Sequence, residues 1–404
     1  MDHRLIGTTV RGLRTPIISE GSDIIKVAVD TVLNASEAGH FNVQDRDILT
    51  ITESVVARSL GNYATLDDIK TDIEKKLNNP ESIGIVFPIL SRNRYYQMLR
   101  AISRSTKKVT ILLSYPSDEV GNALVSVDQL DDADINPYTD TLSEEEFRKT
   151  FGPELPHVFT GVDYPELYKE AVIEGGAEVE IVFSNKPQDI LKYTDNVIVS
   201  DIHTRERTRR LIKKAGGKNV IDLTDLMNEP IDGSGFNAKY GLLGSNQASE
   251  ETIKLFPENA QSLVEEISDK IFDKTGKRIE VMVFGDGAFK DPVGKIWELA
   301  DPVVSPAFTE GLSGTPNEVK LKYLADNDFQ DLEGEELNDS ITAYLRERNE
   351  DEDSDNSSAQ SLGTTPRQIT DLLGSLSDLT SGSGDKGTPM IYIQGYFDNY
   401  ADED

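Results

Sequence analysis

The sequence predicts an α/β protein with a mainly parallel sheet. Between residues 66 and 235, apolar strand-like runs alternate with helical segments. This rhythm is typical of a parallel sheet that helices cover on both faces. Outside that region, runs rich in β-branched residues at 48–52, 279–284 and 390–394 also indicate strands. With 404 residues, the chain is long enough for two or three domains with substantial cores.

Residues 1–65 form the first expected unit. An amphipathic helix is predicted at 22–35, with Ser22 or Asp23 as its cap. The strand at 48–52 leads into a segment that carries Glu53 and Arg58 and ends at Gly61. A carboxylate and a cation after the carboxyl end of a strand are compatible with an active-site edge or with a surface ion pair.

Residues 66–235 are expected to alternate between strands and helices. We expect helices at 66–77, 94–105, 143–150, 165–173 and 204–214, and strands at 83–89, 109–113, 179–183 and 196–200.

The C-terminal part is punctuated by glycine, proline and acidic residues. Pro257 and Asn259 predict the start of a helix that runs to about Phe272, and further helices are expected at 316–324 and 365–379. Residues 347–361 are acidic, polar and free of aromatic side chains, a composition typical of disorder. The glycine-rich stretch 381–389 fits a flexible turn and a phosphate contact equally well.

Charge and composition exclude several classes of function. Lys plus Arg number 41 and Asp plus Glu 72, which gives a net charge of −31. Such a surface repels nucleic acids and anionic lipids, so we expect neither as a partner. The chain has no cysteine and no apolar run near the ~20 residues of a membrane span, as in a cytoplasmic protein.

The stretch 279–302 is the first candidate site. Its strand stops at Gly285-Asp286-Gly287, where glycine allows close backbone approach to a ligand. Lys290, Asp291 and Asp301 follow within a few residues. Carboxylates, lysine and glycine after a strand are typical of phosphate and metal sites. A tight turn with solvated charges is the alternative.

Three ordered blocks resemble the γ-glutamyl ligase family of the deazaflavin coenzyme factor-420. Residues 45–61 are similar to the family pattern DGDVLVV…SKVVSKAEG, and 384–395 to GGDGIPxVVVRG. The middle block runs from Gly241 through Ser245-Asn246 and 255–260 to 276–286, and is similar to NAGIDxSN, LLPEDPDxSA and GKRVxVIITDT. The chain departs from the family at Leu243 and Gly285, where the family has aspartates, and its residues 66–235 are longer.

The resemblance implies an α+β ligase core with an inserted α/β region of mainly parallel sheet. Its expected parts are core segments at 1–65, 236–345 and 363–404, the insertion at 66–235 and a disordered acidic loop at 346–362. The family adds L-glutamate to an anionic acceptor in a reaction that depends on GTP and a divalent metal. The resemblance therefore implies a homodimeric ligase that uses GTP or ATP with Mg²⁺ or Mn²⁺, and a coenzyme or folate-like acceptor.

The roles of individual residues follow from phosphoryl-transfer chemistry, which needs cations on the phosphates. We expect Asp286 and Asp291 to hold the metal, with Asp301 or Glu318 as supports. Lys290 and Arg58 would offset phosphate charge. The residues expected to line the nucleotide cleft are Gly285, Gly287, Ser245 and Asn246. A metal-dependent phosphohydrolase and a non-catalytic nucleotide-sensing or scaffold protein are the alternatives, the latter because of Leu243 and Gly285.

Overall fold

The computed structural model describes residues 5–285, 289–290, 297–298, 305–316, 318–349, 367–382 and 384–402. Its centre is a five-stranded sheet in the order β1-β16-β2-β12-β15. The strands are β1 (Thr9–Leu13), β16 (Met390–Gln394), β2 (Ile48–Thr52), β12 (Glu280–Phe284) and β15 (Ala307–Phe308). The strands predicted at 48–52 and 390–394 are confirmed to the residue.

Within this core sheet, β2 and β12 are the parallel pair. Thr52 lies opposite Phe284 at the carboxyl ends of the two strands. The antiparallel neighbour β16 begins at that same edge, because Met390 lies opposite Ile51. Segments that are far apart in the sequence therefore come together at one edge of the sheet.

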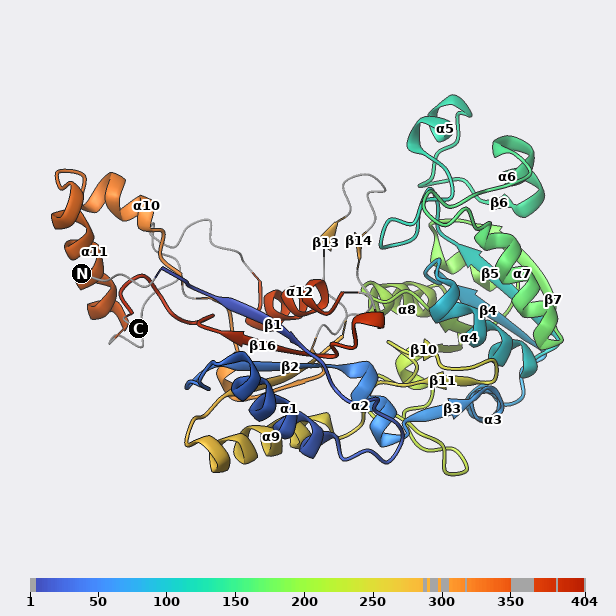
Figure 1. The fold of residues 1–404 in the computed structure, drawn as a ribbon. Helices are drawn as coiled ribbons and strands as arrows, with labels where there is room; N and C mark the ends of the chain where they lie inside the picture. The colour runs from blue at the N-terminus through green and yellow to red at the C-terminus, as the bar shows by residue number, and fades with distance from the viewer. Residues whose placement is uncertain are drawn as a thin grey trace.

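Helices cover both faces of the core sheet (Figure 1). On one face lie α1 (Ile24–Gly39) and α9 (Ala260–Thr275), which pack with inward-facing residues such as Leu49 and Val281. On the other lies α12 (Ile369–Ser381), which packs on the alternate residues of the same strands. The Asp23 side chain accepts a hydrogen bond from the backbone of Lys26, so the predicted cap of α1 is confirmed. The helix α2 (Glu53–Leu60) begins directly after β2.

A small antiparallel sheet joins this core to residues 66–235, which keep here the name inserted region. Its order is β10-β11-β3, from β10 (Asn246–Gln247), β11 (Thr252–Lys254) and β3 (Tyr63–Thr65). Ala64 and Ile253 belong to the same buried apolar cluster as residues of the inserted region. One face of this small sheet is therefore fixed to the insertion.

The inserted region is a doubly wound α/β sheet, which confirms the predicted fold class. Its order is β6-β7-β5-β4-β8-β9, and all strands but β6 run parallel. The strands are β4 (Ser82–Val86), β5 (Lys108–Leu113), β6 (Leu142–Ser143), β7 (Glu178–Phe183), β8 (Asn196–Val199) and β9 (Asn219–Asp222). The helices are α3 (Leu66–Lys76), α4 (Arg92–Arg104), α5 (Val127–Asp132), α6 (Glu144–Phe151), α7 (Tyr164–Gly175) and α8 (Arg205–Lys214), with short helical turns η1 (Pro187–Lys192) and η2 (Leu223–Asp225).

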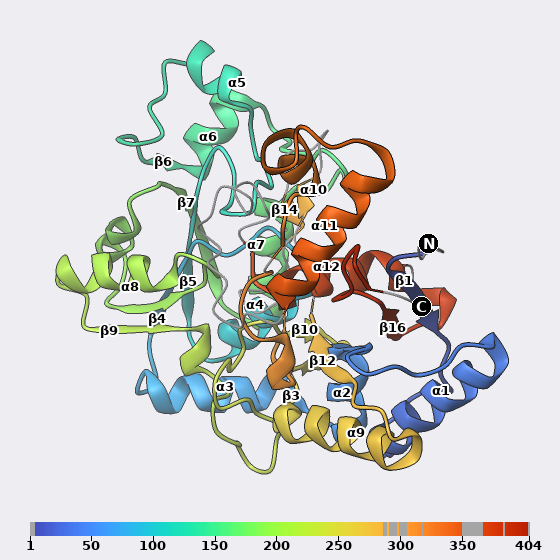
Figure 2. The ribbon, with the colours of Figure 1, turned by 90° about the vertical axis from the view of Figure 1, so that its left-hand side faces the viewer.

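The two faces of this second sheet are both covered (Figure 2). Helices α3, α4 and α7 contribute to the large apolar cluster on one face, and α8 and η1 pack on the other. The strand order reverses between β4 and β8, the point where open α/β sheets form a crevice. At this point the carboxylate of Glu119, from the loop after β5, accepts hydrogen bonds from the backbone N–H groups of Ile202 and His203, which follow β8.

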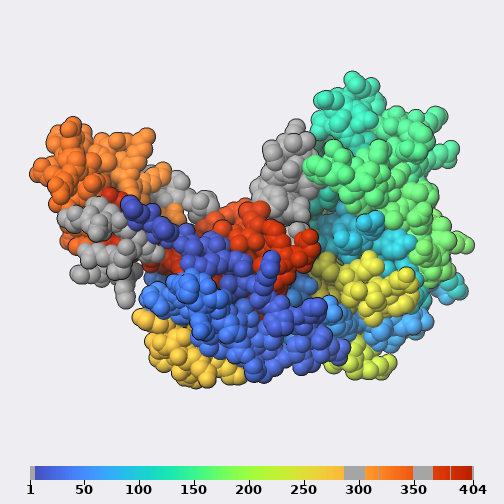
Figure 3. All heavy atoms as spheres, viewed as in Figure 1, coloured from blue at the N-terminus to red at the C-terminus, as the bar shows by residue number. Residues whose placement is uncertain are grey.

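The segment 318–349 forms an arm away from the inserted region. It contains α10 (Leu321–Tyr323), the π-helical turn η4 (Leu324–Asp328) and α11 (Gly334–Asn349). Figure 3 shows the surface hollowed between this arm and the inserted region, with α12 between them. The remaining elements are η3 (Glu310–Leu312), η5 (Gly384–Lys386) and the pair β13 (Phe289–Lys290) and β14 (Trp297–Glu298).

Several predicted boundaries were wrong. The strand predicted at 83–89 ends at Val86, because Phe87 has a left-handed backbone with φ of 55°. The helix expected over 316–324 is only α10 followed by η4. Asn259 precedes α9 without a side-chain cap hydrogen bond. Of the acidic segment 346–362, residues up to Asn349 end α11 and the others lie outside the described residues.

Candidate functional site

The three family-like blocks meet at the carboxyl edge of β2 and β12. Glu53 follows β2 as the first residue of α2, and Gly285 follows β12 beside it, as the register of Thr52 and Phe284 requires. The backbone N–H of Thr52 donates to the carbonyl of Pro389 at 3.0 Å, which brings the glycine-rich stretch to the same edge. Because strand ends of this kind commonly hold ligands in α/β folds, this edge is the candidate site.

Other residues of the same blocks lie at the opposite end of the sheet. Asp45 accepts from the backbone N–H of Arg278 at 2.8 Å and from Lys277 Nζ at 2.9 Å. Asp47 is buried, which raises the pKa of its carboxyl, and it accepts from Tyr392 Oη at 2.7 Å. The length of β2 separates these contacts from Glu53 by roughly 20 Å. They fix the ends of neighbouring strands and take no part in the candidate site.

A buried ion pair lies at the site edge. Lys254 Nζ is 2.8 Å from Glu53 Oε1, and the two side chains are only 10% and 9% exposed. Lys254 pairs across the small sheet with both Asn246 and Tyr63. Directly opposed residues in antiparallel strands point to the same side, so these three side chains share the face towards Glu53.

The segment before β10 explains one departure from the family pattern. Leu243 is 1% exposed and belongs to the apolar cluster of the inserted region, where a carboxylate would be costly. Gly244 has φ of +79°, and a Cβ there would lie 2.4 Å from the Phe256 ring. This turn brings Ser245 to the site edge as a buried residue, and its Oγ has no hydrogen-bond partner among the described residues.

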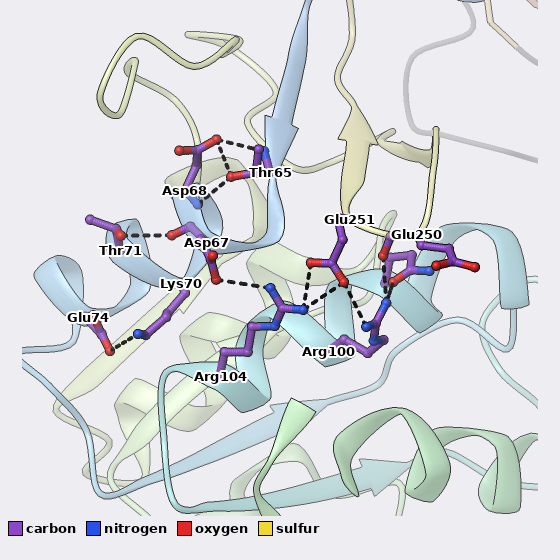
Figure 4. Close-up of polar contacts among 11 residues, drawn as sticks. Thr65, Asp67, Asp68, Lys70, Thr71, Glu74, Arg100, Arg104, Glu250 and Glu251 are labelled. Atoms are coloured by element: carbon purple, nitrogen blue, oxygen red, sulfur yellow. Dashed lines mark hydrogen bonds and ion pairs between the residues drawn. The ribbon is translucent and has the colours of Figure 1, made fainter. Parts of the chain in front are cut away.

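The hairpin that carries Asn246 and Lys254 is clamped to the inserted region (Figure 4). Arg104 of α4 donates to both carboxylate oxygens of Glu251, at 2.7 and 3.0 Å, and to Asp67 at 3.1 Å. Arg100 donates to Glu251 at 3.0 Å and to the carbonyl of Glu250 at 2.7 Å. Two arginines one helical turn apart thereby hold the hairpin tip, which sets the position of Lys254.

The structure places some of the predicted site residues together and others apart. Gly285, Ser245 and Asn246 lie at or beside the edge described above. Arg58 is exposed on α2, where its charge acts on Tyr63. Glu318 is exposed and acts on Tyr396, which lies past the end of β16 at the opposite edge. Glu318 is therefore separate from the candidate site.

The remaining predicted residues are described in part or not at all. The backbone of Lys290 lies in β13. Asp286, Gly287, Asp291 and Asp301 lie outside the described residues. Within the described ranges, no group of three His, Asp or Glu side chains could hold a metal ion. Leu243 and Gly285 supply no side-chain ligand for a metal.

Sequence reasoning missed Lys254 and left Glu53 undecided. Lys254 follows two β-branched residues in a three-residue strand, a signal too short to predict its partners. Glu53 is 201 residues away in the sequence, so only the tertiary structure pairs them. The position of Glu53 directly after a strand was the one available signal.

The fold and this edge define a mixed α/β protein with a second, doubly wound sheet and a candidate site at converging strand ends. The family model described as F420-0:gamma-glutamyl ligase matches residues 12–395 of the 404, and the chain belongs to this family. The predicted resemblance is thereby confirmed, and family membership supports a ligase. No curated protein matches the chain. Among the described residues, no helix is long and apolar enough to cross a membrane.

Proposed function

We propose that the protein is a nucleotide- and divalent-metal-dependent carboxylate–amine ligase that adds L-glutamate to a coenzyme or folate-like acceptor. One observation carries the proposal: the three family-like blocks converge at the edge formed by Thr52, Gly285 and Pro389. Family membership supports the glutamyl transfer and the use of GTP or ATP. We also propose that the protein is cytoplasmic and that it forms a homodimer. Light scattering on the purified protein would test the dimer.

The residues at this edge suit an amide-forming ligase. A carboxylate becomes reactive towards an amine when it is phosphorylated, and this step needs positive charge beside the phosphates. Lys254 places a buried ammonium at the edge, and Arg58 and Lys290 are proposed to add further charge. The Asn246 amide and the Ser245 hydroxyl offer polar groups that can orient a substrate.

A divalent metal, when bound, would neutralise phosphate charge during transfer. We propose that Asp286 and Asp291 hold it, with Asp301 as support, because these carboxylates follow β12 directly in the sequence. Gly285 and Gly287 would allow the chain to pass close to the nucleotide. Glu318 is left out, because it lies with Tyr396 at the opposite edge.

The decisive experiment incubates the purified protein with GTP or ATP, Mg²⁺ or Mn²⁺, L-glutamate and a panel of acceptors. Mass spectrometry would detect glutamyl addition, and a phosphate assay would follow nucleotide hydrolysis. We expect a glutamylated acceptor with the native chain and none with Asp286→Asn. Asp273→Asn, an exposed aspartate on α9, is the matched control and should retain activity.

A non-catalytic nucleotide sensor is the second candidate, and Leu243 and Gly285 favour it because two acidic family positions carry no ligand. Nucleotide binding without any product across the acceptor panel would support the sensor over the ligase. Phosphate release that is independent of glutamate would instead support a phosphohydrolase. An active Asp286→Asn variant would remove Asp286 from the site.

A further inference from the structure

Lys254 is a buried ammonium whose hydrogen bonds are incomplete. The residue is 8% exposed, and its Nζ carries three donors. Glu53 accepts one of them at 2.8 Å. The other two have no acceptor within the described ranges. A buried charge is normally paired and fully hydrogen-bonded, so two donors of this ammonium are not used by the described residues and could serve a ligand.

The neighbours of Lys254 point to the same conclusion. Ser245 is 1% exposed, and its Oγ also has no partner among the described residues. It directly precedes Asn246, which lies opposite Lys254 in the β10–β11 pair. Ser245 and Lys254 therefore lie close together in one hairpin, each with hydrogen-bonding capacity that no described residue uses.

The surroundings favour an anion over a cation or an apolar ligand. The positions where the family has aspartates hold Leu243, within the apolar cluster, and Gly285, without a side chain. The charge of Glu53 is balanced by Lys254, whose Nζ lies 2.8 Å from Oε1.

We propose that Lys254 is an anion-binding residue of this edge, held in place by Glu53, and that it receives an oxygen of a substrate phosphate or carboxylate. The two sources share one chemistry, since both present a negatively charged oxygen to an ammonium. The identity of the ligand rests on the proposed ligase function, but the binding of an anion by Lys254 does not.

The inserted region takes part in this site through the hairpin. Arg100 and Arg104 hold Glu251, four positions after Gln247 and three before Lys254. The other face of the same small sheet is buried against the inserted region through Ile253. One face of the small sheet is thus held by the inserted region, and Glu53 holds the ammonium of Lys254 on the other face. This arrangement suits a preorganised anion contact.

The test measures anion binding to the full chain by isothermal titration, with inorganic tripolyphosphate, GTP and L-glutamate as separate probes. Titrations are run in chelator and then with Mg²⁺. Lys254→Gln alone would leave Glu53 buried without its ammonium, so the key variant is Glu53→Gln/Lys254→Gln, which keeps the pair neutral. The matched control is Lys108→Gln/Glu180→Gln, an ion pair of 2.7 Å between β5 and β7. Circular dichroism checks that each variant is folded.

We expect the site double variant to weaken at least one probe by about 10- to 100-fold, the loss of one charge-assisted hydrogen bond. The control should bind as the native chain does, and Lys254→Arg should retain most of the affinity. Selective loss of tripolyphosphate and GTP identifies a phosphate site, and selective loss of glutamate a carboxylate site.

Unchanged affinities for all three probes in the folded double variant would overturn the proposal. A native chain that binds none of the probes would overturn it as well. Failure of the proposed ligase gives a different pattern. In that case no acceptor is glutamylated, yet anion binding still depends on Lys254.

Discussion

Replacing Lys254 by methionine tests how the site edge is held together. Methionine keeps the length and most of the volume of the lysine side chain but removes its charge. The carboxylate of Glu53 then stays at the junction of β2 and α2, 9% exposed, without the ammonium that lies 2.8 Å away in the native chain. The reverse variant, Glu53→Gln, removes the carboxylate and keeps the amine.

The size of the effect follows from this burial. Removal of one partner from a buried ion pair typically destabilises a protein by about 3–5 kcal/mol. We expect Lys254→Met to approach this range, because both side chains are about nine-tenths buried. Glu53→Gln should cost less, about 1–3 kcal/mol, since the lysine stem is flexible and its amine can move towards solvent. The double variant Glu53→Gln/Lys254→Met should lose less stability than the two single variants lose together, with a coupling free energy of about 2 kcal/mol.

Urea unfolding of the native chain and the three variants, followed by circular dichroism, measures this cycle. The midpoint should shift in the transition that includes the core sheet, with an unchanged m-value. The Lys108→Gln/Glu180→Gln cycle is the control, because that pair is about 40% exposed and should couple weakly, by less than 1 kcal/mol. Additive losses at Glu53 and Lys254, with no coupling, would refute the view that this pair joins the small sheet to the core.

Three more predictions address positions elsewhere in the fold. Leu243→Ala should cost about 2–5 kcal/mol in urea unfolding, because it empties a fully buried site; a loss below 1 kcal/mol would contradict its place in the core. Asp45→Asn should leave both ligand binding and the urea midpoint nearly unchanged, since Asp45 is exposed and far from the site edge. Burial raises the pKa of Glu119 to about 7, so its contribution to stability is present below about pH 4.5 and is lost as the pH rises through 7. Glu119→Gln should remove up to about 3 kcal/mol of this pH dependence, and parallel melting curves of both proteins from pH 5 to 8 would show whether it does.

The sequence predicts local structure here better than it predicts the site. Periodicity and β-branched content are local properties, so they placed β2, β16 and the alternating insertion correctly. The ion pair of Glu53 and Lys254 depends on the register of a small sheet made from segments almost 200 residues apart. No pattern within either segment encodes that register.

The departures from the family pattern show the same contrast between what a local pattern predicts and what only the fold shows. Leu243 could be noticed as a missing carboxylate, but only the fold shows that it belongs to the core of the inserted region. Glu318 looked like a member of an acidic set near the glycine turn. The chain direction of β16 instead carries Tyr396, and Glu318 with it, to the far edge.

These relations give the inserted region a role in the candidate site, although it lies away from the strand ends. The small sheet has two faces: one is buried against the insertion, and the other carries Tyr63, Asn246 and Lys254 towards the core. Any movement of α4 relative to the core sheet would act on the hairpin through Arg100 and Arg104. It would then change the distance between Lys254 and Glu53. The insertion therefore sets the position of the ammonium that we propose as the anion contact, and a ligand that bridges Lys254 and the glycine-containing strand ends would hold the two parts of the chain together.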